Sequence, residues 1–145
     1  MRILFGIFLA LLLGTGNVYA NMAAVSVDRA EIRNFPSVSG SIVTILVPRY
    51  YPLQIQEEQG EFYKVNDFLN NTGWISKTSV DDTRTIVVKE TSINVRQGPG
   101  TKNPVLFRAE KGVAFKVISE ESNWLQVEHA NGTKGWLFKN LIWGD

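Results

Sequence analysis

An internal repeat constrains the fold of this chain more than any other feature. Residues 30–36 (AEIRNFP) align with residues 93–99 (INVRQGP) at an offset of 63. Further along the chain, an offset of 62 aligns residues 73–75 (GWI) with residues 135–137 (GWL). Arg, Pro and Gly-Trp thus recur in the same order at nearly constant spacing, and a single loop deletion accounts for the change of offset. The sequence therefore predicts two copies of one folding unit.

Each copy has the pattern of short strands separated by turns. Apolar and polar residues alternate over residues 93–96, the period of a half-buried strand, and the Gly-Pro-Gly at residues 98–100 forces a loop. Residues 120–123 (EESN) indicate a turn, and Asn131-Gly132 predicts a two-residue hairpin in which both residues take positive φ. Residues 139–142 are expected to form a single helical turn. No segment after the leader shows extended helical periodicity.

The first twenty residues have the pattern of an export signal. Arg2 precedes an apolar run at residues 3–13, and Val18 and Ala20 occupy the small-residue positions of a cleavage site. The run is about half of the roughly 20 residues that a spanning helix needs, which favours a signal peptide over an uncleaved anchor. The chain has no Cys that could carry a lipid. We therefore expect a signal peptide at residues 1–20 and an exported protein, periplasmic or secreted, that is not attached to the membrane after cleavage.

A short polar connection at residues 81–85 (DDTRT) separates the two copies. We expect an all-β protein with one domain at residues 21–82 and a second at residues 83–145. Without Cys there are no disulfides, so apolar cores must stabilise both domains. The formal net charge is +1, and loss of Arg2 with the leader balances the charges. Phosphate binding needs clustered Lys and Arg, so a nucleic acid partner is not expected.

The motifs of the second copy form one pattern. They are the strand and loop at residues 93–100, Lys111-Gly112, Trp124 with Val127, Asn131-Gly132 and Gly135-Trp136. This pattern resembles the bacterial SH3-like (SH3b) domain family over nearly the full length of the copy. The first copy is similar but divergent, with Phe35 where the second copy has Gly98. The resemblance implies two small SH3-like β-barrels in tandem, whose usual role in the family is non-catalytic attachment to cell-wall or protein ligands.

Several recurring residues are expected to support the fold. They are Arg33, Pro36, Trp74, Arg96, Gly98, Pro99, Gly100 and Trp136. Two interpretations of the arginines are open, because each can either buttress its loop by bonding loop carbonyls or capture an anion at the loop mouth. Trp74 and Trp136 can either pack in the core or stack on a ligand. The structural interpretation is favoured for both pairs.

Few residues can support catalysis. His129 is the sole histidine, lies beside the Asn131-Gly132 turn and is expected to be exposed. Without Cys or a second His, neither a Cys-His dyad nor a zinc site can be built. The pairs Glu57-Glu58, Asp81-Asp82 and Glu120-Glu121 lie in polar stretches that indicate solvated loops rather than the two carboxylates of a glycosidase. The sequence therefore predicts no enzyme, no catalytic residues, no metal and no cofactor.

A binding module is the leading hypothesis. The candidate ligand-binding residues lie close to loops and are Phe35, Tyr50, Tyr51, Phe62, Tyr63, Pro99 and Trp124. So many aromatic rings cannot all enter a small core, and exposed aromatics beside polar loops commonly mark a binding surface. Alternatively, the aromatics of the first copy cover the interface between the two barrels.

The expected partner is a cell-wall peptide or glycan, or another envelope protein. The alternative role is an assembly or targeting factor that docks on a partner envelope enzyme. Ligand identity, the number of binding domains, the orientation of the barrels and the oligomeric state are left open by the sequence.

Overall fold

The computed structural model describes residues 21–145, and the predicted signal peptide at residues 1–20 lies outside the described residues. The strands of the first unit are β1 (Asn21–Val25), β2 (Arg29–Arg33), β3 (Val43–Pro48), β4 (Pro52–Gln59), β5 (Phe62–Asn66), β6 (Thr72–Ser76) and β7 (Val80–Asp81). The strands of the second unit are β8 (Thr85–Val88), β9 (Ser92–Arg96), β10 (Val105–Glu110), β11 (Ala114–Glu121), β12 (Trp124–Glu128), β13 (Lys134–Phe138) and β14 (Ile142–Trp143). Single 3₁₀ turns, η1 (Lys77–Ser79) and η2 (Lys139–Leu141), precede β7 and β14, so the helical turn predicted near residue 139 is confirmed.

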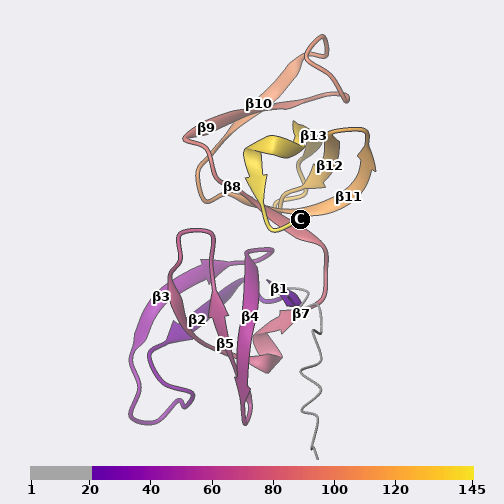
Figure 1. The fold of residues 1–145 in the computed structure, drawn as a ribbon. Helices are drawn as coiled ribbons and strands as arrows, with labels where there is room; N and C mark the ends of the chain where they lie inside the picture. Colours follow the sequence, from indigo (N-terminus) through magenta and orange to yellow (C-terminus); the bar gives the residue numbers. More distant parts are fainter. Residues whose placement is uncertain (1–20) are drawn as a thin grey trace, which may run out of the picture.

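The two units have the same topology. The strand order is β3-β2-β6-β5-β4-β1-β7 in the first sheet and β10-β9-β13-β12-β11-β8-β14 in the second. All strand pairs are antiparallel, and register shifts in the β4–β5 and β11–β12 pairs mark β-bulges in the long strands. Each seven-stranded sheet curls around a core of its own (Figure 1). The prediction of two small tandem β-barrels is confirmed.

Strand alternation builds both cores. On β12 and β13, for example, Leu125, Val127 and Leu137 are completely buried, whereas the residues between them are half-buried on the outer face. The same positions of the first unit are occupied by Tyr63, Val65 and Ile75, of which the last two are completely buried. Apolar side chains at period two therefore hold each sheet in one register, because a slip by one residue would turn them outward.

A glycine closes each sheet where two strands approach closely. A Cβ atom at Gly73 would clash with Ile32 and lie 2.9 Å from the carbonyl oxygen of Arg33. A Cβ atom at Gly135 would lie 2.5 Å from Val95 and 3.1 Å from the carbonyl oxygen of Arg96. Glycine is needed at both positions because β6 packs against β2, and β13 against β9, without room for a side chain.

The two Gly-Trp tryptophans differ from the sequence expectation. Trp74 and Trp136 are half-buried and belong to neither core cluster. The reason is strand alternation: the glycine before each tryptophan and the apolar residue after it, Ile75 or Leu137, point inward. The tryptophans therefore cover the outer face of the sheet, and the prediction that they pack in the core is wrong.

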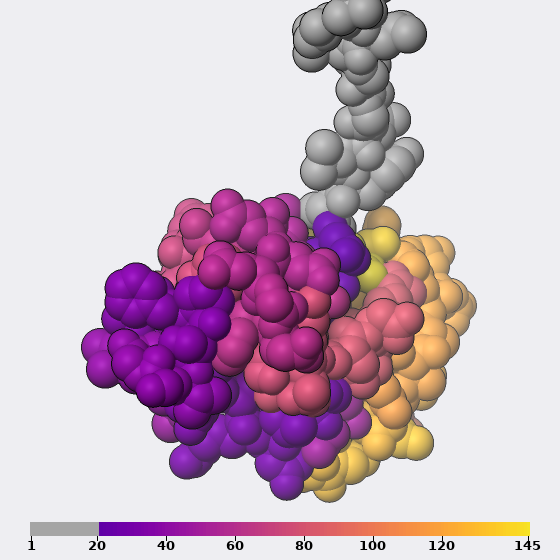
Figure 2. All heavy atoms as spheres, turned by 90° about the horizontal axis from the view of Figure 1, so that it is seen from below, coloured from indigo at the N-terminus to yellow at the C-terminus, as the bar shows by residue number. Residues whose placement is uncertain are grey.

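The β8 strand joins the two units. Ile86 and Val88 lie in the core of the second unit, whereas Val87 and Ala114 belong to the buried cluster of the first. Trp143 packs against the same cluster. All four residues of β8 are buried, as expected for a strand covered on both faces. In Figure 2, the atoms of the second unit, orange to yellow, lie directly against those of the first.

Ion pairs hold Arg84, in the connection between the units, to the second unit. Arg84 pairs with Asp145 and, at 2.9 Å, with Glu120. Lys139 donates to Glu120 at 2.6 Å. The hydrogen bonds from Lys139 and Arg84 lower the pKa of Glu120, and those from Arg84 and Lys139 lower the pKa of Asp145. These contacts tie residue 84 to two parts of the second unit, the end of β11 and the last residue, Asp145.

Several turn predictions need correction. β11 continues through Glu121, so the turn contains only Ser122 and Asn123, and Ser122 has a φ of 53°. The Glu57-Glu58 and Glu120-Glu121 pairs are exposed as expected, but they lie on the ends of long strands rather than in loops.

The hairpin between β12 and β13 is also longer than predicted. It is closed by a bond from the Gly132 amide to the His129 carbonyl at 2.8 Å, and only Gly132 has positive φ. The Asn131 side chain accepts a hydrogen bond from the Thr133 amide at 2.9 Å, which stabilises the wider turn.

The change of repeat offset is located in one loop. Residues 34–42 connect β2 to β3 in the first unit, and residues 97–104 connect β9 to β10 in the second, so the second loop is one residue shorter. Strand pairing brings Val43 opposite Arg33 and Val105 opposite Arg96, which restores the register after each loop. The one-residue difference in length between the two copies therefore lies in the loop after β2 or β9.

Replacing Gly135 by Ala should destabilise the second unit, because the added methyl group meets Val95 and backbone. We expect a loss of about 1–3 kcal/mol in the free energy of unfolding, the usual cost of overpacking, measured by urea denaturation. Lys134→Ala, at the exposed preceding position, is the control and should change stability little. Equal stability of the Gly135→Ala variant and the wild type would contradict the close approach of β13 to β9.

Candidate functional site

A cleft of about 480 Å³ lies on the outer face of the second unit. It is lined by side chains from β9, β12, β13, η2 and the β9–β10 loop: Asn94, Arg96, Gly100, Thr101, Trp124, Phe138 and Leu141. Trp124 and Phe138 are directly opposite on β12 and β13, with ring centroids 5.6 Å apart and ring planes inclined by 53°. They form an aromatic wall because their inward neighbours, Leu125 and Leu137, occupy the core.

Arg96 forms the polar side of this cleft. Its Nη1 donates hydrogen bonds to the carbonyl oxygens of Thr101 at 3.0 Å and Asn103 at 2.9 Å. This is the geometry of a buttress that ties the β9–β10 loop to the strand. Within residues 21–145, Nη2 and Nε of Arg96 have no hydrogen-bond partner, and the side chain has no ion pair. The N–H donors on Nη2 and Nε, along one edge of the guanidinium, are therefore not used by the loop.

The Gly-Pro-Gly segment shapes the loop beside Arg96. Gly98 is buried, and a Cβ atom there would lie 2.6 Å from the side-chain oxygen of Asn103. Gly100 has a φ of 143°, and its carbonyl accepts a hydrogen bond from the Asn103 side chain at 3.3 Å. Pro99 lies half-buried between the two glycines and does not line the cleft.

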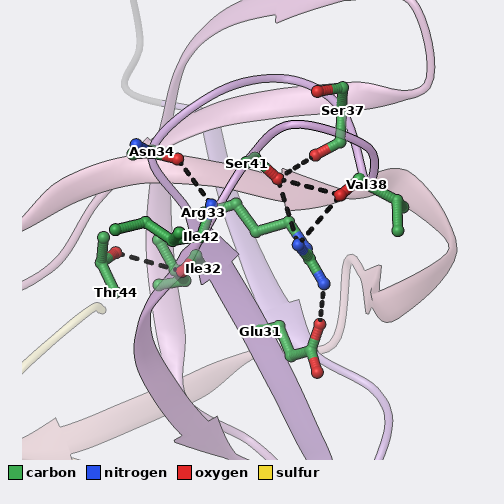
Figure 3. Close-up of polar contacts among 9 residues, drawn as sticks. All are labelled: Glu31, Ile32, Arg33, Asn34, Ser37, Val38, Ser41, Ile42 and Thr44. Atoms are coloured by element: carbon green, nitrogen blue, oxygen red, sulfur yellow. Dashed lines mark hydrogen bonds and ion pairs between the residues drawn. The ribbon is translucent and has the colours of Figure 1, made fainter.

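The first unit has a smaller cleft at the equivalent position. Its volume is about 290 Å³, and Glu31, Arg33, Phe62 and Ser76 are among its lining residues. Phe62 occupies the position of Trp124, and Ser76 occupies that of Phe138, so the aromatic wall lacks one ring. Arg33 donates from Nη1 to Ser41 at 3.1 Å and from Nη2 to the Glu31 carboxylate at 2.6 Å (Figure 3). The charge of this arginine is therefore balanced within the unit.

Tyr51 lies inside the core of the first unit. It is 7% exposed, its ring makes an edge contact with Phe68, and its hydroxyl donates to Asp67 at 2.9 Å. Asp67 also accepts bonds from the amides of Leu69 and Asn71, so it organises the β5–β6 loop. Burial, together with the hydrogen bond to Asp67, raises the pKa of Tyr51 well above its ordinary value.

Tyr50 lies at the junction of the units. It packs against the buried cluster that includes Val87 and Ala114, and the Lys116 ammonium lies 6.0 Å from its ring centroid. Its φ is 70°, in the left-handed region where the second copy has Gly112 with a φ of 90°. Tyr50 thus lies where the interface interpretation of the first-copy aromatics puts it, whereas Tyr51 is a core residue of the first unit.

The other predicted residues do not form one site. Phe35 is 57% exposed in the β2–β3 loop, next to the half-buried Pro36. Tyr63 packs against the core of the first unit, and its ring lies 5.2 Å from the Lys77 ammonium. Of the seven candidate ligand-binding residues, only Trp124 lines the cleft of the second unit.

The prediction that His129 is exposed is wrong. Its ring is half-buried and makes an edge contact with Phe115 at 5.7 Å between centroids. Its Nδ1 accepts a hydrogen bond from the Asn131 amide at 3.1 Å, so the imidazole closes the hairpin loop. It takes the position that Asp67 has in the first unit, where the side chain also accepts loop amides.

Four cleft residues were missed by the sequence reasoning: Asn94, Thr101, Phe138 and Leu141. Phe138 had a usable signal, because it follows Trp136 by two residues on a strand and therefore shares its outer face. Asn94, Thr101 and Leu141 had none, since their positions depend on how β9, the β9–β10 loop and η2 fold toward the aromatic wall.

Within residues 21–145, no group of three His, Cys, Asp or Glu side chains is arranged to hold a metal ion. In the same range, no helix is long and apolar enough to span a membrane.

Comparison with protein families agrees with the repeat. One profile described as a bacterial SH3 domain matches residues 28–81, and a second with the same description matches residues 89–144. The chain belongs to the bacterial SH3 domain family and contains two such domains in tandem. Each match covers six strands of one seven-stranded sheet, all but β1 in the first and all but β8 in the second. The more divergent first copy is therefore matched too.

Curated relatives carry provisional enzyme names. The chain is 24% identical over 132 residues to the N-acetylmuramoyl-L-alanine amidase YrvJ of Bacillus subtilis, covering 83% of the chain and 25% of that protein. It is 38% identical over 60 residues to the cell wall amidase LytH of Staphylococcus epidermidis, covering 41% of the chain and 20% of that protein. The chain thus spans about a quarter of the first relative and a fifth of the second.

Solved structures give weaker similarities. NlpC2 from Trichomonas vaginalis aligns with a TM-score of 0.40 and 11% identity, over 88% of this chain and 49% of that chain. An NlpC/P60 family protein from Bacillus cereus aligns with a TM-score of 0.39 and 14% identity, over 84% and 55%.

Tyr51→Phe should lower the stability of the first unit, because it removes the hydroxyl group that donates a hydrogen bond to the buried Asp67 carboxylate. We expect a loss of about 1–3 kcal/mol in the free energy of unfolding, measured by urea denaturation near neutral pH. Tyr63→Phe is the matched control and should cost about 0.5 kcal/mol or less.

The same pair of variants should show a pH dependence. A tyrosine whose pKa is raised on folding holds its proton more tightly in the folded state, so its stabilisation is complete below the unfolded pKa of about 10 and declines above it. The stability difference between the wild type and Tyr51→Phe should therefore shrink as the pH rises above about 10. A difference that is constant or grows over this range would contradict the buried hydrogen bond.

Proposed function

We propose that this protein is a non-catalytic binding module of the bacterial cell envelope, exported by its predicted signal peptide, which recognises cell-wall peptide or glycan-peptide. The observation that carries the proposal is the aromatic cleft on a bacterial SH3 domain. The names of the amidase relatives support a cell-wall setting, because the similarity to them runs through the region matched by these domains.

The cleft has the size and chemistry of a binding site. Its volume of about 480 Å³ lies within the range of ligand pockets, roughly 300–1,000 Å³. Trp124 and Phe138 offer ring faces on which a peptide group or a sugar ring can pack. Asn94 and Arg96 supply hydrogen-bonding groups at the opposite side.

The cleft also lacks the groups that hydrolysis requires. None of its seven lining residues is His, Cys, Asp, Glu or Lys, so it contains no general base and no activated nucleophile. Binding without chemistry is the activity that its residues support.

Replacing Trp124 by Ala should weaken binding to purified peptidoglycan sacculi. We expect the amount of mature protein that sediments with sacculi to fall about tenfold, since a buried aromatic anchor is typically worth 1–2 kcal/mol or more. Phe62→Ala, the equivalent change in the first unit, tests whether both domains bind.

Ile118→Ala is the control, because Ile118 is an exposed apolar residue on β11 outside the cleft. Each variant should keep its melting temperature within a few degrees of the wild type, which separates lost binding from lost folding. Equal sedimentation of the Trp124→Ala and Ile118→Ala variants would reject the cleft as the wall-binding site.

A second candidate function is docking on a partner envelope enzyme. Large apolar side chains are exposed in the β2–β3 loop and on β3 of the first unit: Phe35 at 57%, Val38 at 69%, Ile42 at 66% and Leu46 at 52%. Monomeric soluble proteins rarely expose so many neighbouring apolar groups without a partner.

A Phe35→Ser, Ile42→Ser double variant separates the two functions. If the surface docks on an enzyme, the variant should no longer retain a purified cell-wall amidase in a pull-down, while its sedimentation with sacculi is unchanged. The reverse result, lost sedimentation with intact amidase retention, would assign the surface to wall binding and reject enzyme docking.

A further inference from the structure

The two SH3 domains differ in whether the arginine shared by their equivalent clefts has an acidic partner. In the first domain, Glu31 accepts a hydrogen bond from Arg33 at 2.6 Å (Figure 3). In the second domain, the position of Glu31 is occupied by Asn94, and Arg96 takes the place of Arg33. The second cleft therefore has the same guanidinium without the carboxylate that covers it.

A second guanidinium adjoins the cleft of the second domain. Arg108 lies opposite Asn94 on β10, and its Nη1 donates to the Asn94 side-chain oxygen at 3.2 Å. Its Nε donates to Ser92 at 3.2 Å. The equivalent position of the first domain is Leu46, which is opposite Glu31. Among residues 21–145, neither Arg96 nor Arg108 has an acidic partner within 4.0 Å, whereas Arg33 does.

We propose that the cleft of the second domain binds a peptide carboxylate on the free edge of Arg96, with the preceding residues of the peptide packed against Trp124 and Phe138. The first domain shows how a carboxylate sits on this arginine, because Glu31 occupies the place that the ligand takes in the second. The inference rests on the proposed function and adds the chemical group that is recognised.

Several observations favour a carboxylate over a neutral ligand. The lining residues of the second cleft include one cation and no anion. Arg96 is held in place by its two bonds to loop carbonyls, so little side-chain entropy is lost when a ligand binds. Hydrogen bonds between a guanidinium and a carboxylate are shorter and stronger than those between neutral groups. The first domain cannot bind such a ligand at Arg33 while Glu31 is present.

The test is an NMR titration of the mature protein with three probes. They are acetyl-trialanine with a free C-terminal carboxylate, the same peptide as its C-terminal amide, and acetyl-alanyl-glutamyl-alanine amide. We expect shifts at residues 94–101 and at Trp124, with the free acid binding about tenfold more tightly than the trialanine amide, the effect of one hydrogen bond to a charged group. Tighter binding of the glutamyl peptide than of the free acid would assign the site to side-chain carboxylates.

Asn94→Glu gives the second domain a carboxylate at the position of Glu31 in the first domain. It should reduce the affinity for the free acid about tenfold more than it reduces the affinity for the amide. Arg108→Leu, which copies Leu46, is the second variant if the first fails to fold, and it should reduce both the affinity and its salt dependence. Lys134→Ala, on the same sheet but outside the cleft, is the control and should bind as the wild type does.

Equal binding of acid and amide, binding of neither at millimolar concentration, or wild-type affinity of both cleft variants would overturn the inference. Sacculus sedimentation distinguishes this failure from that of the proposed function. Wild-type protein that sediments with sacculi but does not prefer the acid rejects only the carboxylate. Protein that prefers the acid but does not sediment rejects only the cell-wall role.

Discussion

Each domain depends on one close approach between two strands. Gly73 of β6 packs against β2 in the first domain, and Gly135 of β13 packs against β9 in the second. The contact puts the methyl groups of Ile32 or Val95 where a side chain would otherwise be, so the sheet can curl back on itself. Strand pairing at this point brings Trp74 opposite Arg33 and Trp136 opposite Arg96. The closure of the barrel, the position of the buttress arginine and the outer-face tryptophan are thus consequences of one contact.

The junction between the domains depends on β8. Its side chains alternate between two cores, with Ile86 and Val88 on one side and Val87 on the other. Apolar burial on both faces of one strand stabilises the pair of domains as well as the second barrel. Tyr51 belongs to the cluster that Val87 completes, and Tyr50 packs against it. Two aromatic residues that resemble a binding surface in the sequence are therefore used for packing.

The repeat keeps a scaffold and varies the surface on it. Arg33 and Arg96 both bond their own loop, which maintains the strand and loop in both domains. The residues beside them differ: Glu31, Phe62 and Ser76 surround one arginine, whereas Asn94, Trp124 and Phe138 surround the other. The first cleft is smaller, and the charge of its Arg33 is balanced by Glu31. The second is larger, aromatic and cationic, and it is the better candidate for a ligand.

The sequence by itself determined the repeat, the all-β class and most strands, because period-two apolar patterns and Gly-Pro-Gly or Gly-Trp signals depend on local chemistry. It also indicated Trp124 as a candidate ligand-binding residue and favoured both arginines as loop supports. It could not place Tyr51 or His129, since their surroundings come from strands far apart in the chain. It could not exclude Trp74 and Trp136 from the core, because hydrophobicity alone does not show which face of a strand is inward. Only the tertiary structure decided these points, by bringing β9, β12 and β13 together and by leaving Arg96 without the acid that covers Arg33.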